Sequence, residues 1–293
     1  MSNIFIKLKN SFWCLPDKLK ISIFFLVKQG YLMNWSKPVT FNQKIQARKL
    51  GLSNRHAILA DKIKVRDYVR KKCGDEILIP ILAKYKNTSE IDTKSLPDSW
   101  VMKTNHGSGP EHIEIVWDKD RVSQHKIVEK FNHALQEDYV GVRLGETHYN
   151  LIDRHILVEE LMLSEGKIPD DYKFHVFQSN GDFKWFLQVD FDRYSKHKRN
   201  LYDDELNLLD YSLNYQSGNF EIENKELVFE MAEVAKKLAT DFNYVRVDLY
   251  LIDSQIYFGE LTFLPASGFQ KFHPREVDKE WGKLWAKSTD GMF

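Results

Sequence analysis

The sequence of 293 residues lacks the features that define several common classes of protein. It has only two cysteines, Cys14 and Cys73, which are too few for a disulfide scaffold and indicate a reducing compartment. Its 42 basic and 42 acidic side chains give a formal net charge of zero, so a surface built to bind nucleic acid is not expected. The longest apolar run near the N-terminus, Ile21 to Val27, is much shorter than the roughly 20 residues of a membrane span. We therefore expect a cytoplasmic protein that has no transmembrane segment and binds no nucleic acid.

Several catalytic signatures are also absent. The ten histidines form neither an H-x-H nor an H-E-x-x-H motif, so a zinc site has little support. There is no G-x-x-x-x-G-K-[ST] run, which excludes the best-known phosphate-binding loop. No Ser-His-Asp or Cys-His arrangement of a nucleophilic enzyme can be singled out. The remaining composition, with 43% hydrophobic and 29% charged residues, is ordinary for a globular protein.

Hairpins alternate with single helices along the chain, and this order predicts an α+β protein of two lobes. Alternation and turn residues predict strands at 77–82, 100–105, 112–117, 156–162, 172–178, 183–191, 244–252 and 256–263. Apolar residues at helical spacing predict helices at 123–139 and 227–242. We expect three regions, namely a helical N-terminal segment (1–60), a first lobe with a glycine loop (61–162) and a second lobe with a metal site (163–293).

The segment from Leu19 to Leu32 mixes apolar and basic positions and allows two interpretations. Packing against the rest of the protein is the commoner role of such a helix. A basic amphipathic helix can instead lie on a membrane surface, so a peripheral membrane association stays open.

Two carboxylates in the last predicted hairpin are candidates for a metal site. Alternation places Arg246 and Asp248 on one face of the first strand, while Glu260 and Thr262 share a face of the second. If residues 253–255 form the turn, Asp248 lies opposite Glu260 with Cβ atoms about 5 Å apart. A hard cation such as Mg²⁺ would relieve the repulsion between them. The alternative is a hairpin exposed to water, with both acids solvated.

A second feature is Lys103, on a predicted strand that leads into the loop His106-Gly107-Ser108-Gly109. Glycines let backbone N–H groups approach an anion closely, and a lysine beside them adds a full positive charge. The loop is therefore a candidate phosphate clamp, although a G-x-G in a hairpin is most often an ordinary turn.

Further charged residues lie in or beside predicted strands. Glu159 and Glu160 interrupt an apolar strand, where an uncompensated charge would be costly, so we expect them to receive hydrogen bonds. Asp171 and Lys173 are two residues apart and share one face of the following strand, where a nucleotide could lie. An ordinary surface salt pair explains those two residues equally well.

The triplet Asp190-Phe191-Asp192 follows an apolar strand. Many glycosyltransferases hold a metal and a nucleotide sugar with a D-x-D pattern of this kind. Because so short a motif often occurs by chance, it supports a glycosyltransferase only as an alternative.

In this order the motifs resemble the ATP-grasp superfamily and, within it, the TupA-like family, which is associated with teichuronopeptide and other cell-surface polysaccharide synthesis. The resemblance runs from about Phe41 to Gly268, and the conjunction of the motifs is more specific than any one of them. The matching segments are Phe41–Ile45 (FNQKI), Asp61–Arg66 (DKIKVR), Val101–Gly109 (VMKTNHGSG), Ile156–Glu160 (ILVEE), Asp171–Phe174 (DYKF), Arg246–Asp248 (RVD) and Gly259–Thr262 (GELT).

The resemblance implies an ATP-grasp fold, in which two α+β lobes with antiparallel sheets grip ATP and Mg²⁺ and a helical extension precedes them. The implied phosphate contacts are Lys62, Lys103, Lys173 and the loop residues His106, Gly107, Ser108 and Gly109. The implied adenine and ribose contacts are the hinge residues Glu159, Glu160 and Met162, together with Asp171. The implied metal ligands are Asp248, Glu260 and Thr262, which stands where many members have Asn, and the implied catalytic side chains are Arg246 and Lys173.

The activity that the resemblance implies is an ADP-forming carboxylate-amine ligase. A substrate carboxylate attacks the γ-phosphate, an acyl phosphate forms, and an amine displaces phosphate to give an amide. The family suggests a uronic acid of a surface glycan or its precursor as the acid, and an amino acid or small amine as the partner. Three other functions stay open: a kinase or phosphotransferase on the same fold, a glycosyltransferase that uses Asp190 and Asp192, and a nucleotide-binding scaffold without turnover.

Overall fold

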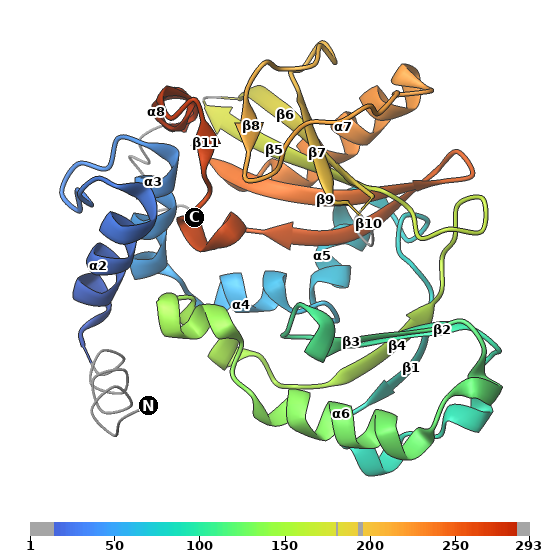
Figure 1. The fold of residues 1–293 in the computed structure, drawn as a ribbon. Helices are drawn as coiled ribbons and strands as arrows, with labels where there is room; N and C mark the ends of the chain where they lie inside the picture. The colour runs from blue at the N-terminus through green and yellow to red at the C-terminus, as the bar shows by residue number, and fades with distance from the viewer. Residues whose placement is uncertain (1–14, 180, 193–195, 286–293) are drawn as a thin grey trace.

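Two antiparallel sheets face one another across the molecule (Figure 1). The computed structural model describes residues 15–179, 181–192 and 196–285. The four-stranded sheet has the order β1-β4-β2-β3 and contains β1 (Ile81–Tyr85), β2 (Trp100–Thr104), β3 (Ile113–Val116) and β4 (Ile156–Glu160). The five-stranded sheet has the order β10-β9-β5-β6-β7 and contains β5 (Asp171–Ser179), β6 (Asp182–Phe191), β7 (Lys198–Tyr202), β9 (Tyr244–Ile252) and β10 (Gln255–Thr262). The predicted α+β class is confirmed.

The remaining elements cover or connect these sheets. A short ribbon pairs β8 (Ser212–Leu213) with β11 (Phe272–His273). The helices are α2 (Asp17–Gln29), α3 (Phe41–Arg48), α4 (Asn54–Ala60), α5 (Val65–Cys73), α6 (Gln124–Gln136), α7 (Lys225–Ala239) and α8 (Glu276–Leu284). Short 3-10 helices are η1 (Lys49–Gly51), η2 (Thr88–Glu90), η3 (Thr93–Ser95), η4 (Pro110–His112), η5 (Lys119–Arg121), η6 (Val140–Leu144), η7 (Thr147–Leu151) and η8 (Pro265–Gly268).

The first predicted strand is wrong in its position. We expected it at residues 77–82, whereas β1 begins at Ile81, directly after Pro80, whose ring removes the N–H that a central ladder needs. The apolar residues just before the proline are buried instead, and Leu78 forms an isolated parallel bridge with Phe258 of β10. This short contact ties the start of the four-stranded sheet to the edge of the five-stranded sheet.

A small core lies between the four-stranded sheet and α6, which covers the outer face of that sheet (Figure 1). Alternation on β2 buries Trp100 and Met102 completely, and they pack with Val158 of β4. Helix α6 adds Ile127 and Phe131, which are four residues apart and therefore on one helix face. The opposite face of this sheet carries charged residues.

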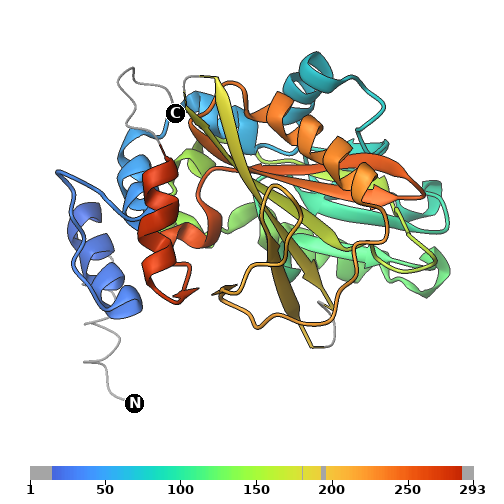
Figure 2. The ribbon, with the colours of Figure 1, turned by 90° about the horizontal axis from the view of Figure 1, so that it is seen from above.

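The large core joins parts of the chain that are far apart in sequence. Helices α3, α5, α7 and α8 all contribute to one apolar cluster around the five-stranded sheet. In Figure 2, α8 and the N-terminal helices lie together at one end of the molecule. Val65 and Val69 of α5 belong to this cluster, although the first lobe was expected to begin at residue 61. The division into three regions stays a prediction.

The described part of the N-terminal segment is helical. Helix α2 buries Ile21 and Phe25, as expected for a packed helix, but its other side leaves Leu19, Ile23 and Val27 exposed. The membrane-surface interpretation therefore stays open, and residues 1–14 lie outside the described part of the chain. Among the described residues, no helix combines the length and the apolar character needed to cross a bilayer.

One face of the five-stranded sheet changes character along its strands. At one end Phe177 of β5 pairs with Tyr244 of β9. Both rings pack against Phe41 of α3, and Phe177 also packs against Trp281 of α8. Two pairs further along the same face, the partners are Lys173 and Asp248. The face is thus aromatic where helices cover it and charged where it turns toward the four-stranded sheet.

Candidate functional site

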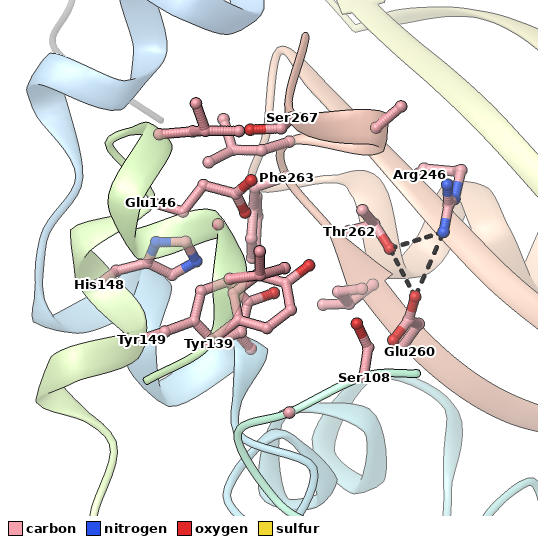
Figure 3. A pocket seen from close by; sticks show the side chains of 18 of the residues that line it. Ser108, Tyr139, Glu146, His148, Tyr149, Arg246, Glu260, Thr262, Phe263 and Ser267 are labelled. Atoms are coloured by element: carbon pink, nitrogen blue, oxygen red, sulfur yellow. Dashed lines mark hydrogen bonds and ion pairs between the residues drawn. The ribbon is translucent and has the colours of Figure 1, made fainter. Parts of the chain in front are cut away.

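A cavity of about 280 Å³ is lined by the loop that follows β2 and by residues of β9 and β10. Lys62, Gly107 and Ser108 contribute to one side, and Figure 3 shows Arg246, Glu260 and Thr262 on the other. The remaining wall comes from η6, η7, η8 and their flanks, namely Ala60, Tyr139, Val140, Gly141, Leu144, Glu146, His148, Tyr149, Leu261, Phe263, Leu264, Ala266 and Ser267. Six residues that the sequence selected are therefore brought together in one space.

The glycine loop between β2 and β3 needs glycine at two positions for different reasons. A Cβ atom at Gly107 would lie 2.1 Å from Nδ1 of His112, so no side chain fits there. Gly109 has φ +89°, a backbone conformation that side chains of L-residues rarely adopt. Thr104 accepts a hydrogen bond from the Gly107 N–H at 3.2 Å, and the loop is thereby held close to the strand end.

Lys62 is attached to this loop from a distant part of the chain. Its backbone N–H donates to the carbonyl of Asn105 at 3.1 Å, and its ammonium group donates to the carbonyl of Gly107 at 2.7 Å. Burial lowers the pKa of Lys62, an effect that the nearby carboxylate of Glu260 opposes. The side chain therefore lies between the glycine loop and β10.

Lys103 of β2 forms an ion pair with Glu159 of β4 at 2.5 Å, and Arg66 approaches the same carboxylate at 3.7 Å. The predicted compensation of Glu159 is confirmed. Glu160 is exposed, and its N–H donates to the carbonyl of Pro80 at 3.1 Å. Met162, which follows the end of β4, is half-buried. The roles of these residues in holding adenine stay predictions.

Asp248 does lie opposite Glu260, but the predicted turn is wrong by one residue. The turn contains Asp253 and Ser254 only, so residue 255 pairs with residue 252. A β-bulge between Phe258 and Glu260 then shifts the register by one and restores the expected pair. Gly259 lies in the bulge, where a Cβ atom would come within 3.0 Å of the Asp248 carbonyl oxygen.

Arg246 is the cation that lies between these two carboxylates. Its Nε and Nη2 donate to the two oxygens of Asp248, each at 2.7 Å, and Nη2 also reaches Glu260 at 3.2 Å and Thr262 at 3.0 Å. Thr262 in turn donates to Glu260 at 3.0 Å. Burial alone would lower the pKa of Arg246, but the carboxylate of Asp248 raises it overall. Figure 3 shows the triangle of Arg246, Glu260 and Thr262 at the cavity wall.

Asp248, Glu260 and Thr262 supply the type of donor atom that a divalent cation binds. Two opposed carboxylates and a hydroxyl are oxygen donors of the type that Mg²⁺ takes together with phosphate oxygens. Glu260 is engaged through Oε1, and its side chain is 42% exposed. Both oxygens of Asp248, by contrast, are occupied by Arg246. In the described ranges there is no group of three or more acidic, histidine or cysteine residues that could hold a metal by itself.

Lys173 is surrounded by three aspartates. Its ammonium group lies 3.0 Å from Asp171, 3.3 Å from Asp248 and 3.9 Å from Asp190. The strand register explains this cluster, because Lys173 pairs with Asp248 while Asp171 pairs with Asp190. Asp171 and Lys173 therefore share a face, as predicted, but they form part of a buried network and not an exposed salt pair.

The D-x-D hypothesis gains no support from the structure. Asp190 is buried, and Arg199 binds both of its oxygens, at 2.5 and 3.0 Å. Burial would raise the pKa of Asp190, but the charge and hydrogen bonds of Arg199 outweigh it and lower the pKa. Asp192, in contrast, lies beyond the strand end and is exposed. One carboxylate is neutralised inside the protein and the other faces solvent, so they do not form a metal-binding pair.

His106 lies behind the glycine loop and is 1% exposed. Its ring packs edge-on against that of His112 with a centroid distance of 5.4 Å. Burial, followed by the charge of Arg154, lowers the pKa of His106 to about 4, so the ring is neutral near pH 7. The side chain supports the loop from within, which differs from the expected contact with a phosphate.

Sequence reasoning missed the wall formed by η6, η7 and η8. Tyr139, Glu146 and Tyr149 have no spacing that marks them as functional. Tyr139 and Glu146 directly precede η6 and η7, and Tyr149 lies in η7, and these short segments have no repeating pattern. Two consecutive residues with positive φ, Ala266 at +46° and Ser267 at +54°, complete this wall. Such backbone strain in non-glycine residues often accompanies a functional site, but it is visible only in the structure.

Lys62 and the glycine loop after β2 lie opposite Arg246 and Glu260 of the five-stranded sheet, which agrees with the expected ATP-grasp class. Within that class, the sequence model described as TupA-like ATPgrasp matches residues 43–286, and the chain belongs to this family. The predicted family and fold are confirmed.

Solved structures give more distant likenesses. D-alanine-D-alanine ligase from Helicobacter pylori is 13% identical with a TM-score of 0.49, over 78% of this chain and 62% of that one. D-alanyl-alanine synthetase A from Vibrio cholerae is 15% identical with a TM-score of 0.41, over 70% of this chain and 55% of that one. Phosphoribosylamine-glycine ligase from Thermotoga maritima is 12% identical with a TM-score of 0.42, over 70% of this chain and 48% of that one. The chain thus spans 48–62% of the length of these proteins. No curated protein matches the sequence.

Proposed function

We propose that this protein is an ADP-forming ligase that joins a carboxylate to an amine through an acyl phosphate. The observation that carries the proposal is the shared cavity, in which Lys62 and the glycine loop lie opposite Arg246 and Glu260. Phosphoryl transfer needs positioned positive charge around the γ-phosphate and little covalent help from the protein. A cavity with basic side chains on two walls and no activated nucleophile suits that chemistry.

The proposed nucleotide site extends from the cavity along the gap between the sheets. Lys62, Lys103 and the loop residues 107–109 bind the phosphates, and Lys173 approaches them from β5. Asp171 binds the ribose, and the segment 159–162 binds adenine at the connection between the sheets. Asp248, Glu260 and Thr262 would hold Mg²⁺, and the cation would then share the Asp248 carboxylate with Arg246. Bound there, it would neutralise charge on the phosphates. Arg246 then stabilises the negative charge of the transferring phosphoryl group.

The proposed reaction has two steps. A carboxylate oxygen of the acid attacks the γ-phosphorus of ATP, a new P–O bond forms, the bond to the β–γ bridging oxygen breaks, and ADP leaves. The lone pair of the amine nitrogen then attacks the acyl carbon, the C–N bond forms, and inorganic phosphate leaves with the electrons of the C–O bond. The protons that the amine loses pass to solvent. Arg246 and Lys62 hold the acid and the phosphoryl group in line during the first step.

The proposed acid is a uronic acid of a surface glycan or its nucleotide-linked precursor, and the reaction takes place in the cytoplasm, where ATP is supplied. This finer assignment rests on the association of the TupA-like family with cell-surface polysaccharides. The small number of cysteines agrees with a reducing compartment.

The test is a product screen with nucleotide-linked uronic acids and small amines, analysed by mass spectrometry. We expect ADP and phosphate to appear only when acid and amine are both present, together with the mass of an amide. An ¹⁸O label in the acid should appear in the released phosphate, because breakdown of an acyl phosphate transfers that oxygen. Release of AMP and pyrophosphate, or a phosphorylated hydroxyl as product, would reject the ligase in favour of adenylation or a kinase. Tight ATP binding without any product would favour the scaffold.

A further inference from the structure

The two ends of the cavity differ in their charged groups. Figure 3 shows Arg246 with Glu260 at one end and Glu146 at the other, and Lys62 is the second basic residue of the lining. Between them stand the rings of Tyr139 and Tyr149, whose pKa values both respond to Glu146 on one side and to Glu260 and Arg246 on the other. The tyrosines therefore bridge the two ends of one space.

Glu146 is a buried carboxylate that faces this cavity. The residue is 3% exposed, and its backbone N–H donates to the carbonyl of Gly141 at 3.0 Å. Glycine at position 141 is needed for this approach, since a Cβ atom there would lie 2.6 Å from the carboxyl carbon of Glu146. The side chain accepts a hydrogen bond from Ser267. A carboxylate has room for about four hydrogen bonds, so acceptor capacity remains for a ligand.

The nearest cation is committed to other acceptors. Lys49 donates to the carbonyl of Leu144 at 2.8 Å, to the carbonyl of Ser267 at 2.9 Å and to the hydroxyl of Ser267 at 2.9 Å. An ammonium group has three N–H donors, so these bonds use all of them. Burial raises the pKa of Glu146, and the charge of Lys49 and the hydrogen bond from Ser267 oppose that rise. The carboxylate lines the cavity and is the acidic group at this end of it.

The other polar groups at this end are neutral. Burial and the neighbouring His56 lower the pKa of His148 to about 3, so its imidazole carries no charge near pH 7. Burial and the charge of Glu146 raise the pKa of Tyr139 to about 12, so its hydroxyl is intact. The rings of Tyr139 and Tyr149 lie 4.3 Å apart and add aromatic surface, to which a cation is attracted.

We propose that this end of the cavity binds the primary ammonium group of the amine substrate, with Glu146 as its anchor and the tyrosine rings as its wall. The proposal rests on the ligase function proposed above and adds the location and charge of one substrate. An acid substrate would be repelled by Glu146 and attracted by Lys62 and Arg246 at the other end. The cavity would therefore separate the two substrates by charge, and the bound ammonium group would give one proton to Glu146 before its nitrogen attacks the acyl phosphate.

The test uses two small probes of equal size and opposite charge, n-propylammonium chloride and sodium propionate. Saturation-transfer NMR and titration calorimetry measure the binding of each probe to the full chain. A separate titration measures the binding of a non-hydrolysable ATP analogue in the presence of Mg²⁺. We expect propylammonium to bind the wild type and to lose at least tenfold in affinity in Glu146→Gln, which removes the charge but keeps the shape. Glu146→Asp should retain part of the affinity. Glu230→Gln, at an exposed position on α7, is the matched control and should bind as the wild type does.

Each outcome decides one of the two proposals. Equal binding of propylammonium to the wild type and Glu146→Gln, or stronger binding of propionate at this end, would overturn the ammonium site. If Glu146→Gln does not fold, a wild-type crystal soaked with propylammonium decides, because its nitrogen must lie within hydrogen-bond distance of the Glu146 carboxylate. If the wild type binds propylammonium but not the ATP analogue, the ligase function is rejected and the ammonium site must serve another function. Intact nucleotide binding without a propylammonium site would reject only the further inference.

Discussion

Lys103 on the four-stranded sheet and Lys173 on the five-stranded sheet are the same kind of side chain in different surroundings. Lys103 faces one carboxylate, that of Glu159, which it shares with Arg66. Lys173 lies within 4 Å of three aspartates and is half as exposed as Lys103, at 10% against 21%. At the small sheet two cations thus face one carboxylate, that of Glu159, whereas on the large sheet one cation is enclosed by three carboxylates.

This difference separates two tasks. An excess of positive charge is useful where a triphosphate must be attracted. A balanced network inside a sheet stabilises the fold and holds side chains in fixed positions, and it is costly to break because the remaining charge stays buried. We expect substitutions near Glu159 and the glycine loop to affect ligand binding, and substitutions in the buried network of Lys173, Asp190 and Arg199 to affect stability. The following experiments test this expectation, starting with the largest effect.

Removing the charge of Asp190 should produce the largest loss of stability. Asp190→Asn leaves the guanidinium of Arg199 buried without a charged partner, so we expect the free energy of unfolding to fall by about 3–5 kcal/mol. Urea denaturation followed by tryptophan fluorescence measures this change. Asp182→Asn, at the exposed start of the same strand, should change stability by less than about 0.5 kcal/mol. Equal midpoints for the two variants would show that the network is not structural.

Replacing Lys103 of the small sheet, or Lys62 of the turn before α5, should weaken nucleotide binding without unfolding the protein. For Lys103→Met and for Lys62→Met we expect the affinity for Mg-ATP to fall about 10- to 100-fold, which corresponds to one charged hydrogen bond. Calorimetric titration measures this loss. Lys84→Met is the control, since Lys84 is exposed on β1 of the same sheet. Unchanged affinity in both variants would remove these lysines from the nucleotide site.

Filling the bulge in the large sheet should disturb the register that aligns Asp248 with Glu260. Gly259→Ala places a methyl group 3.0 Å from the carbonyl oxygen of Asp248 and 3.1 Å from the ring of Tyr250, so we expect a loss of roughly 1–2 kcal/mol in stability. Metal-dependent nucleotide binding should weaken as well. Gly51→Ala is the control, because a Cβ atom there meets no neighbour. A variant with wild-type stability and binding would show that the bulge tolerates a side chain.

Lowering the pH should reduce the stability of the folded protein through one buried histidine in each region, over different pH ranges. Burial lowers the pKa of His106 in the small lobe to about 4 and that of His175 in the large sheet to about 3, from an ordinary value of about 6.5. Below pH 6.5 the unfolded chain binds protons on these histidines that the folded chain does not. The free energy of unfolding therefore falls as the pH falls toward the pKa of the folded state. His106→Gln should flatten the stability curve between pH 6.5 and 4, and His175→Gln down to pH 3. His133→Gln, at an exposed position, should leave the curve unchanged.

Much of the fold could be predicted because its signals are local. The hairpins at 100–117 and 172–191 follow from alternation on each side of a glycine-containing turn. The helix α7 follows from apolar residues at helical spacing. The strand expected at 77–82 was displaced because Ile77 and Leu78 are buried by the large core, a contact that no local pattern reports.

The carboxylate pair illustrates how far the site could be predicted. Alternation assigned Arg246 and Asp248 to one face, and that assignment is confirmed. The facing of Asp248 and Glu260 was also predicted, but through a turn that is one residue too long and without the bulge that corrects it. The shorter turn and the β-bulge shift the register by one residue in opposite directions. The predicted pair is therefore correct, although the predicted turn is wrong.

The sequence by itself determined which elements form, which side chains share a strand face and which family the chain resembles, because these depend on periodicity and on short motifs. Only the tertiary structure decided that Arg246 lies between the carboxylates, that Lys173 is enclosed by three aspartates and that Glu146 faces the cavity. The physical reason is that charge pairing and burial depend on contacts between residues far apart in the chain. Lys49, Glu146 and Ser267 meet at one wall although more than 200 positions separate the first from the last.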